Sequence, residues 1–592
     1  MNFMLANTWG LWALLGLPAV IAIHFLQRRN RRVPATTLFL LEQMKRESRT
    51  GNRFERLRTS IPFWLQLLMV LLITWLLVQP RWLKNDAVQR IAIVMDASAS
   101  MQAFSEPALR AADDVLGLLE GPIARAELTL LSSDAEAPSL YHGTQPGDLR
   151  QALAGWEPLL GVHDFSPALR VARGLVGPKG VVVLITDHPL AASPPFGAHL
   201  VSVGQETDNV GWAGVTVEEK DGQWIWHALV KNYSRVPQER QWHAVADGTA
   251  SQPKPIKIAP GEIQTLSGPF PPESVKQLVL RLQGDALPID DDLPLVRPKP
   301  KTLALCPLEK GSGDLTDIFG RYAHLRLVNV PGESDLVAAI MTPSFALPEQ
   351  RHGCFFQSKA DPAAPYLKGN IVPEPHPLVE GLNWQGLLVR ESKAMPRQAQ
   401  DRVLLWQGER PLIMLRQMPS GGRQLICQFD LQTSNARKLP AFAVLLHRFL
   451  ETLRADKIAP EAANFDVRQK IIVAHHTGSE AAPLMIETTT KTELPLAQAR
   501  LLRAPARPGH FTVKQGDLML LTAAAHFADT READLTQAKP FNELDQIKAT
   551  QIETLHEVDP NQRLWLLLLL FLLLGSWWFT NSKREVREAA TA

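Results

Sequence analysis

The stretch RIAIVMDASASM, residues Arg90–Met101, decides the fold of the region around it. It begins as a continuous apolar run, IAIVM, which is typical of a strand buried on both faces of a parallel sheet. Asp96, Ser98 and Ser100 follow directly, separated only by alanines. Because ligands of open α/β sheets bind outside the carboxyl ends of strands, this spacing predicts one carboxylate and two hydroxyls directed at a single point. Hard oxygen ligands of this kind suit Mg²⁺.

The same residues have a purely structural interpretation, in which Ser98 or Ser100 caps the next helix by accepting a backbone N–H. The two interpretations are compatible. The Asp-x-Ser-x-Ser pattern after an apolar strand resembles the metal-ion-dependent adhesion site of von Willebrand factor A domains. The resemblance implies that Ser98 and Ser100 contact the ion, that Asp96 and Asp187 hold coordinated waters, and that one position stays open for an acidic residue of a protein partner.

The resemblance covers residues 86–205, where predicted strands alternate with predicted helices. Such alternation favours a doubly wound parallel sheet. The further predicted strands are Ala126–Leu131, Val181–Ile185 and His199–Val203, and the predicted helices are Glu106–Leu119, Gly147–Ala154 and Ser166–Leu175.

The remaining metal ligands depart from the family pattern. Asp187, at the end of an apolar strand, matches the last ligand, but His188 stands where the family has glycine. The position of the central threonine carries His163, with Asp164 next to it. Imidazole is a better ligand for Zn²⁺ or Mn²⁺ than for Mg²⁺. We therefore treat His163 and Asp164 as tentative ligands, or as surface residues beside a degenerate site, and expect Mg²⁺, with Mn²⁺ as the alternative.

Three apolar segments predict membrane-spanning helices: Thr8–Leu26, Ile61–Val78 and Leu564–Phe579. Residues 27–60 hold ten Lys/Arg and three Asp/Glu, a net charge of +7 against +2 for the whole chain. The positive-inside rule places this loop and the basic C-terminal tail in the cytoplasm, and residues ~80–560 outside. The first segment lacks the charged leader of a signal peptide, so we expect it to be retained.

The stretch HFLQRRNRRVPATTLFLLEQ, His24–Gln43, followed by a second apolar segment and QPRW, resembles the N-terminal module of BatA-type aerotolerance regulators. Within it, Pro34–Leu41 could lie on the inner leaflet or dock a cytoplasmic partner. The resemblance implies a multi-pass protein of the inner (cytoplasmic) membrane with periplasmic domains. It also implies association with a MoxR-type AAA+ ATPase and other von Willebrand A membrane proteins. We expect no nucleic-acid partner.

The rest of the chain predicts further domains. Short alternating runs over 206–299 favour a β-sandwich. Its acidic run Asp290–Asp292 is interpreted as a solvated turn rather than a Ca²⁺ site. Residues 300–457 resemble a class I glutamine amidotransferase-like domain through HPLVEGLNW (His376–Trp384) and Gly421–Leu450. No nucleophile elbow surrounds Cys354, and His376 lacks an orienting acid, so we predict a non-catalytic scaffold.

These predictions give an α/β and β multidomain membrane protein. Its expected parts are a membrane module (1–85), the von Willebrand A-like domain (86–205), the β-sandwich (206–299), the amidotransferase-like domain (300–457), a small β domain (458–525), a connector (526–563), the last membrane helix (564–580) and a cytoplasmic tail (581–592).

Two functions of different class follow. The first is a non-enzymatic interaction scaffold, in a MoxR-associated system for envelope assembly or stress tolerance. The alternative is a thiol-dependent amidotransferase or hydrolase. Membrane transport is disfavoured because the apolar segments carry no buried ionisable pair.

Overall fold

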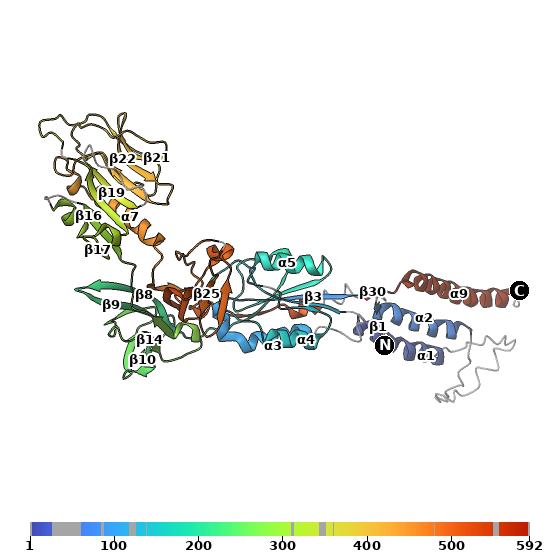
Figure 1. The fold of residues 1–592 in the computed structure, drawn as a ribbon. Coiled ribbons are helices and arrows are strands. Elements are labelled where there is room, and N and C mark those ends of the chain that lie inside the picture. Colours follow the sequence, from blue (N-terminus) through green and yellow to red (C-terminus); the bar gives the residue numbers. More distant parts are fainter. Residues whose placement is uncertain are drawn as a thin grey trace, which may run out of the picture.

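The computed structural model describes residues 3–26, 61–83, 88–117, 126–137, 139–308, 313–341, 351–358, 360–478, 480–548 and 556–589. The domains lie one after another in an elongated arrangement (Figure 1). Apolar helices occupy one end and an α/β domain with an eight-stranded sheet occupies the other, with two β domains and a first α/β domain between them.

The first α/β domain contains a six-stranded sheet of order β29-β7-β6-β3-β4-β5. Its strands are β3 (Gln89–Met95), β4 (Ala126–Ser132), β5 (Tyr141–Gly143), β6 (Val181–Thr186), β7 (His199–Val203) and β29 (Pro540–Asn542). Strands β4, β3, β6 and β7 are parallel, whereas β5 and β29 pair antiparallel at the two edges. The predicted strands and helices of this region are confirmed close to their expected bounds.

The apolar run of β3 explains the layers of this domain. Because strand side chains alternate, Ile91, Ile93 and Met95 pack with α3 (Ser105–Leu116) and α4 (Pro146–Leu153) on one face. The intervening Ala92 and Val94 pack with α5 (Ser166–Val176) on the other face. All five side chains are buried, so the carboxyl end of β3 is fixed by packing on both sides.

The predicted connector over 526–563 does more than link the last β domain to the membrane. Its strand β29 pairs with β7, and Ile547 is fully buried in the core of the first α/β domain. The first α/β domain therefore includes a segment that lies more than three hundred residues after β7 in the sequence.

The β-sandwich forms as predicted between residues 210 and 295. One sheet contains β8 (Val210–Lys220), β9 (Gln223–Asn232) and β13 (Ile263–Pro269). The other contains β10 (Gln238–Ala246), β11 (Thr249–Ala250), β12 (Lys254–Ile258), β14 (Leu278–Leu282) and β15 (Asp292–Leu295). Inward side chains such as Trp212, Trp226 and Leu280 form the core between the sheets.

The second α/β domain has an eight-stranded sheet of order β17-β16-β18-β19-β23-β22-β21-β20. Its strands are β16 (Leu303–Leu308), β17 (Leu325–Leu327), β18 (Leu336–Met341), β19 (His352–Gln357), β20 (Ile371–Pro373), β21 (Asp401–Gln407), β22 (Arg410–Gln417) and β23 (Arg423–Cys427). Helices α6 (Asp314–Phe319) and α7 (Pro440–Asp456) contribute to its main core.

The last β domain contains β24 (Glu461–Asp466), β25 (Leu484–Glu487), β26 (Lys491–Leu494), β27 (Gly509–Gln515) and β28 (Leu518–His526). The apolar run at residues 471–473 is typical of a strand, but the structure forms none there. Lys470 makes an isolated bridge with Arg503, and Ile471 and Val473 are buried in the core of this domain.

Two described helices are long and apolar enough to cross a membrane: α2 (Ile61–Val78) and residues Gln562–Asn581 of α9 (Gln562–Ala589). The first predicted span is divided between a 3-10 helix, η1 (Thr8–Leu15), and the short helix α1 (Gly16–Leu26), so three continuous spanning helices are not supported. Pro18 gives a physical reason, because proline lacks the N–H that would continue an α-helix back through residue 14. The basic loop 27–60 and Pro34–Leu41 lie outside the described residues.

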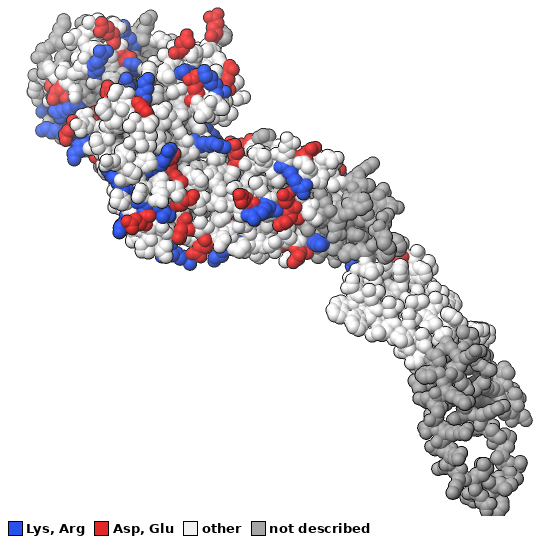
Figure 2. Space-filling model, turned by 90° about the horizontal axis from the view of Figure 1, so that it is seen from below, with Lys and Arg blue, Asp and Glu red and all other residues white. Residues whose placement is uncertain are grey.

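A small sheet joins the apolar segments to the domains. Strands β1 (Phe3–Leu5), β2 (Pro80–Leu83) and β30 (His556–Val558) pair antiparallel in the order β1-β2-β30. They adjoin the start of η1, the end of α2 and the start of α9, respectively. The domain-facing ends of the three apolar segments are thus held together. Figure 2 shows an almost entirely uncharged surface on the visible described face of this helical region, with charge only at its domain-facing end, whereas both signs of charge are spread over the domains.

Candidate metal centre

Asp96 lies where β3 leaves the sheet, and its carboxylate is fully buried. Oδ1 accepts a hydrogen bond from the Ser98 backbone N–H at 2.8 Å, and Oδ2 accepts one from Thr186 Oγ1 at 2.6 Å. Burial raises the pKa of Asp96, and the nearby charge of Asp187 acts in the same direction. Holding this carboxylate as an anion therefore requires compensating positive charge or hydrogen bonds.

Ser98 and Ser100 lie beside Asp96, with their hydroxyl oxygens 3.2 Å apart. Ser98 directly precedes the 3-10 helix η3 (Ala99–Phe104), yet its side chain makes no capping hydrogen bond. The structural interpretation of this serine as a side-chain cap is thus wrong. Both hydroxyls remain directed at the same small region as the Asp96 carboxylate, and both line one cavity with it.

Asp187 follows β6 and brings a second buried carboxylate to this cavity. His188 shares a 2.6 Å hydrogen bond with Asp187 Oδ1. Burial alone would raise the pKa of Asp187, but this hydrogen bond and the charge of His188 lower it. The same hydrogen bond raises the pKa of His188. His188, which replaces the family's glycine, therefore supports Asp187 as an anion.

Glu532 is a site residue that the sequence analysis missed. It comes from the segment after β28, and its Oε2 accepts the Ser100 backbone N–H at 3.2 Å, 432 residues away in sequence. Only 7% of Glu532 is exposed. Burial, followed by repulsion from Asp96 and Asp187, raises its pKa to about 7. No local motif marks this glutamate, so only the folded arrangement identifies it.

The segment that carries Glu532 is fixed on both sides. Asp529 accepts a hydrogen bond from the Val162 backbone N–H at 3.3 Å. Lys539 donates its backbone N–H to the Asp187 carbonyl at 3.1 Å. Glu532 is therefore placed by contacts to the two loops that also border the candidate site.

The tentative ligands His163 and Asp164 line the same cavity, but their polar atoms bind elsewhere. His163 Nε2 lies 2.6 Å from Ser133 Oγ, and its Nδ1 lies 3.0 Å from the Gly161 carbonyl oxygen. Asp164 is exposed and accepts both the N–H and the hydroxyl of Ser166 at the start of α5, which lowers its pKa. The structure brings both residues to the site without directing them at Asp96.

The donor atoms at this site are of the type that Mg²⁺ prefers. Asp96, Ser98, Ser100, Asp187 and Glu532 present oxygen atoms to one open cavity of about 970 Å³. Ligands at adjacent octahedral positions, each about 2.1 Å from Mg²⁺, lie about 3 Å apart. The 3.2 Å separation of the serine hydroxyls agrees with this spacing. The carboxylates of Asp96 and Asp187 beside these hydroxyls also match the preference of Mg²⁺ for hard, anionic oxygen ligands.

Cys354 would be the nucleophile of the alternative thiol enzyme, but its surroundings do not activate it. Cys354 lies within β19, is fully buried, and has a pKa that burial raises well above its ordinary value. A reactive cysteine needs the opposite, a lowered pKa and access to a base. Among the described residues no hydrogen bond joins His376 to Cys354, and His376 Nδ1 instead accepts the Leu378 backbone N–H at 3.2 Å.

Comparisons with solved structures give only weak likeness. A GH2 β-galacturonidase from Eisenbergiella tayi shares 9% identity over 25% of this chain and 33% of that chain, with a TM-score of 0.13. The pilus adhesin SpaC from Lactobacillus rhamnosus GG shares 8% over 74% of this chain and 64% of that chain, with a TM-score of 0.15. The chain spans about a third of the length of the β-galacturonidase that it matches. At such scores these similarities carry no argument about function.

Comparisons of sequence are more informative. Nothing among curated proteins matches the chain. Residues 210–294 match a family described as "Domain of unknown function (DUF7407)", which coincides with the β-sandwich. Residues 1–80 match the family described as "Aerotolerance regulator N-terminal" (BatA), which covers the apolar module and its basic loop. The N-terminal region is therefore similar to that of BatA-like aerotolerance regulators, in agreement with the resemblance in its sequence.

Proposed function

We propose that this protein is a membrane-anchored, non-enzymatic scaffold that binds protein partners through a von Willebrand A-type domain formed by the first α/β domain. The observation that supports it best is the convergence of Asp96, Ser98, Ser100, Asp187 and Glu532 on one cavity at the carboxyl edge of the sheet. When bound there, Mg²⁺ adds to the positive charge that His188 supplies beside Asp187, and it can accept one further carboxylate from a partner.

Glu532 changes how such binding works. In an open adhesion site the partner supplies the last carboxylate, whereas here a carboxylate of the same chain lies against Ser100. We propose that a partner's acidic residue competes with Glu532. Partner binding is then coupled to movement of the segment between Asp529 and Lys539, which is held at the site by two backbone contacts.

The membrane anchor in this proposal has three spans, with the domains outside. Helices α2 and α9 pack together through Met69, Leu72 and Leu572. Segment η1–α1 packs on α2 closely enough that a Cβ at Gly10 would lie 2.6 Å from the α2 backbone. At about 2.0 Å per residue in a 3-10 helix and 1.5 Å in an α-helix, η1 and α1 together reach roughly 30 Å, the thickness of a hydrocarbon core. The β1-β2-β30 sheet keeps the outer ends of all three segments on one side.

The match of residues 1–80 to aerotolerance regulators supports a role in an envelope assembly or stress-tolerance system of the inner membrane. A MoxR-type AAA+ ATPase is the proposed cytoplasmic partner, and the basic loop 27–60 and the C-terminal tail are the parts of the chain available to it. The buried position of Cys354 supports the non-enzymatic role over a thiol amidotransferase.

The test is a pull-down from detergent extract with the full chain, in Mg²⁺ and in EDTA. Wild type should retain a partner in Mg²⁺ and lose it in EDTA, and Asp96→Ala should lose it in both. Asp148→Ala, which removes an exposed aspartate of α4, is the matched control and should behave as wild type. Equal capture by Asp96→Ala and wild type would reject the proposal. Capture that instead requires Cys354 would favour the enzyme.

A further inference from the structure

A second group of carboxylates lies in the β-sandwich, in and beside the loop between β14 and β15. Asp285, Asp290 and Asp291 each offer an oxygen atom, and these atoms lie within 4.8 Å of one another. Asp290 is fully buried. The predicted acidic run Asp290–Asp292 is therefore only partly solvated. Asp292 alone leaves the group, because its carboxylate forms two hydrogen bonds with Arg281.

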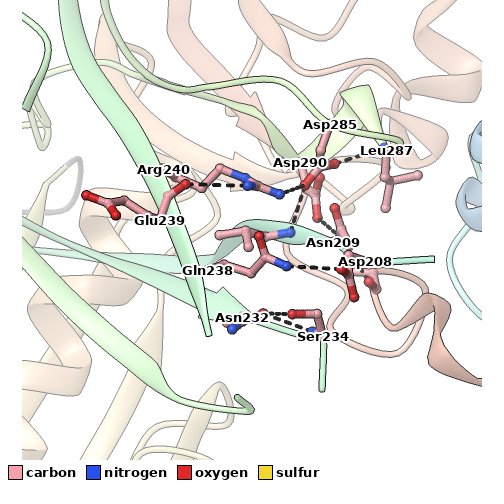
Figure 3. Close-up of polar contacts among 12 residues, drawn as sticks. Asp208, Asn209, Asn232, Ser234, Gln238, Glu239, Arg240, Asp285, Leu287 and Asp290 are labelled. Carbon is pink, nitrogen blue, oxygen red and sulfur yellow. Dashed lines mark hydrogen bonds and ion pairs between the residues drawn. The ribbon is translucent and has the colours of Figure 1, made fainter. Parts of the chain in front are cut away.

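The charges of this cluster are poorly compensated. Asp285 accepts backbone N–H groups of Val210 and Leu287, at 2.8 and 3.1 Å. Arg240 is the ion-pair partner found among the described residues, with 3.9 Å between its guanidinium and Asp285 (Figure 3). When all three carboxylates are ionised, they and one guanidinium carry a net charge of about −2 in a largely buried site, which costs free energy unless a cation is present. Burial and mutual repulsion accordingly raise the pKa of Asp291 to about 7.

Oxygen atoms without partners point to what the cluster lacks. Within the described part of the chain, Asp290 Oδ1 and Asp291 Oδ1 are buried and have no hydrogen-bond partner. Asn209, which is also fully buried, directs its amide at the cluster, with Nδ2 2.8 Å from Asp290 Oδ2 (Figure 3). Its Oδ1 likewise has no partner among the described residues. Buried acceptors of this kind are rare in folded proteins unless a donor or a cation satisfies them.

We propose that Asp285, Asp290 and Asp291 bind Ca²⁺, with the Asn209 amide N–H holding the Asp290 carboxylate in place at 2.8 Å. Ca²⁺ binds oxygen ligands at 2.3–2.6 Å, so three oxygen atoms that all lie within 4.8 Å of one another can contact one ion. Mg²⁺ demands near-octahedral geometry, whereas Ca²⁺ accepts the irregular ligand sets that a loop provides. A divalent ion also neutralises the net charge of the cluster. Gly211 lets the backbone approach, because a Cβ there would lie 1.9 Å from Asp290 Oδ2.

The site has a structural consequence that goes beyond the proposed function. Asn209 Nδ2 also donates to the Ala533 carbonyl at 2.9 Å, in the residue after Glu532. Leu287, Ile289 and Ala533 belong to one small apolar core at this junction. Ca²⁺ therefore orders the contact between the β-sandwich and the segment that carries Glu532. Binding at Asp290 does not depend on a metal at Asp96.

Terbium luminescence tests the proposal on the detergent-solubilised full chain. Tb³⁺ replaces Ca²⁺ at oxygen sites and is excited through a nearby tryptophan. Trp212 is placed for this, because its indole N–H donates to the Asp291 carbonyl at 2.9 Å. All measurements use protein with Asp96→Ala, which disables the candidate Mg²⁺ site. The result then reports on the β-sandwich site alone and does not depend on whether the proposed function is correct.

Luminescence should appear with Tb³⁺, be displaced by Ca²⁺, and fall at least tenfold in Asp290→Asn and in Asp291→Asn. Trp212→Phe should lower the signal several-fold without changing the Ca²⁺ concentration that displaces the ion. Asp292→Asn, which changes a neighbouring acid outside the cluster, should match its parent. The absence of Ca²⁺-displaceable luminescence in the parent, or luminescence in both cluster variants as strong as in the parent, would overturn the proposal. If either variant fails to fold, a Ca²⁺-dependent rise in the parent's Tm of several degrees is still required, and an unchanged Tm would overturn it as well.

Discussion

Replacing Glu532 with glutamine should stabilise the first α/β domain when divalent cations are absent. Glutamine keeps an oxygen acceptor for the Ser100 N–H and removes a charge that Asp96 and Asp187 repel. A pKa raised from 4.5 to about 7 corresponds to about 3 kcal/mol of unfavourable free energy for the ionised side chain. At pH 8 in EDTA, the free energy of unfolding of Glu532→Gln should exceed that of wild type by about this amount.

The dependence on pH has a definite sign. Between pH 4.5 and 7 the unfolded chain ionises Glu532 while the folded protein keeps it protonated, so wild type loses stability as the pH rises through this window. Below pH 4.5 the two proteins should differ little at this position, and above pH 7 the difference should be constant. Mg²⁺ should reverse the order, because wild type gains an anionic ligand that the variant lacks.

Hydrogen exchange of the β3 amides, followed by mass spectrometry on the full chain, measures this difference directly. About 3 kcal/mol corresponds to exchange roughly 100-fold slower in Glu532→Gln than in wild type, in EDTA at pH 8. Glu106→Gln, at an exposed position of α3, is the control and should change exchange less than tenfold. Equal or faster exchange in Glu532→Gln under these conditions would refute the electrostatic reasoning.

Three further predictions concern topology, chemistry and stability. A cysteine introduced at Thr50, on the cytoplasmic side, should resist a membrane-impermeant thiol reagent in intact cells, whereas one introduced at exposed Thr489 should react. The three native cysteines are buried and should give little background labelling. Cys354→Ser should leave partner capture intact, and loss of capture by a folded, correctly inserted protein would contradict this. Asp401→Asn should lower the free energy of unfolding of the second α/β domain by about 3–5 kcal/mol in denaturant titrations, because it leaves the buried Arg416 guanidinium, now 2.6 Å from Asp401, without its charge partner. A loss below about 1 kcal/mol would show that Arg416 is solvated.

The first half of the candidate site could be predicted from the sequence because its signal is local. An apolar strand followed by Asp96, Ser98 and Ser100 defines both the element and the side chains at its end. Asp187 follows a second apolar strand, and parallel neighbours β3 and β6 bring the two carboxyl ends together. These predictions needed only strand burial and the rule that ligands lie at the carboxyl edge.

The second half could not be predicted, because it depends on contacts distant in sequence. Glu532 reaches Ser100 only after the chain has passed through three other domains. His163 aligned with a metal ligand, yet both ring nitrogens are used by Ser133 and Gly161, which no spacing rule could indicate. The acidic run Asp290–Asp292 is interpreted from the sequence as a solvated turn. The structure instead buries Asp290 beside Asp285 and Asp291, and only Asp292 turns away, toward Arg281.

Mn²⁺ binding, followed by electron paramagnetic resonance with the full chain in detergent, tests the central claim most directly. The full chain is required, because residues 86–205 alone would lack β29 and Glu532. Asp290→Asn is present throughout, so that only the Asp96 site is observed. The account predicts one bound Mn²⁺ per chain, displaced by Mg²⁺, lost in Asp96→Ala and kept in Asp148→Ala. No bound Mn²⁺ in the parent protein, or undiminished binding in Asp96→Ala, would contradict it.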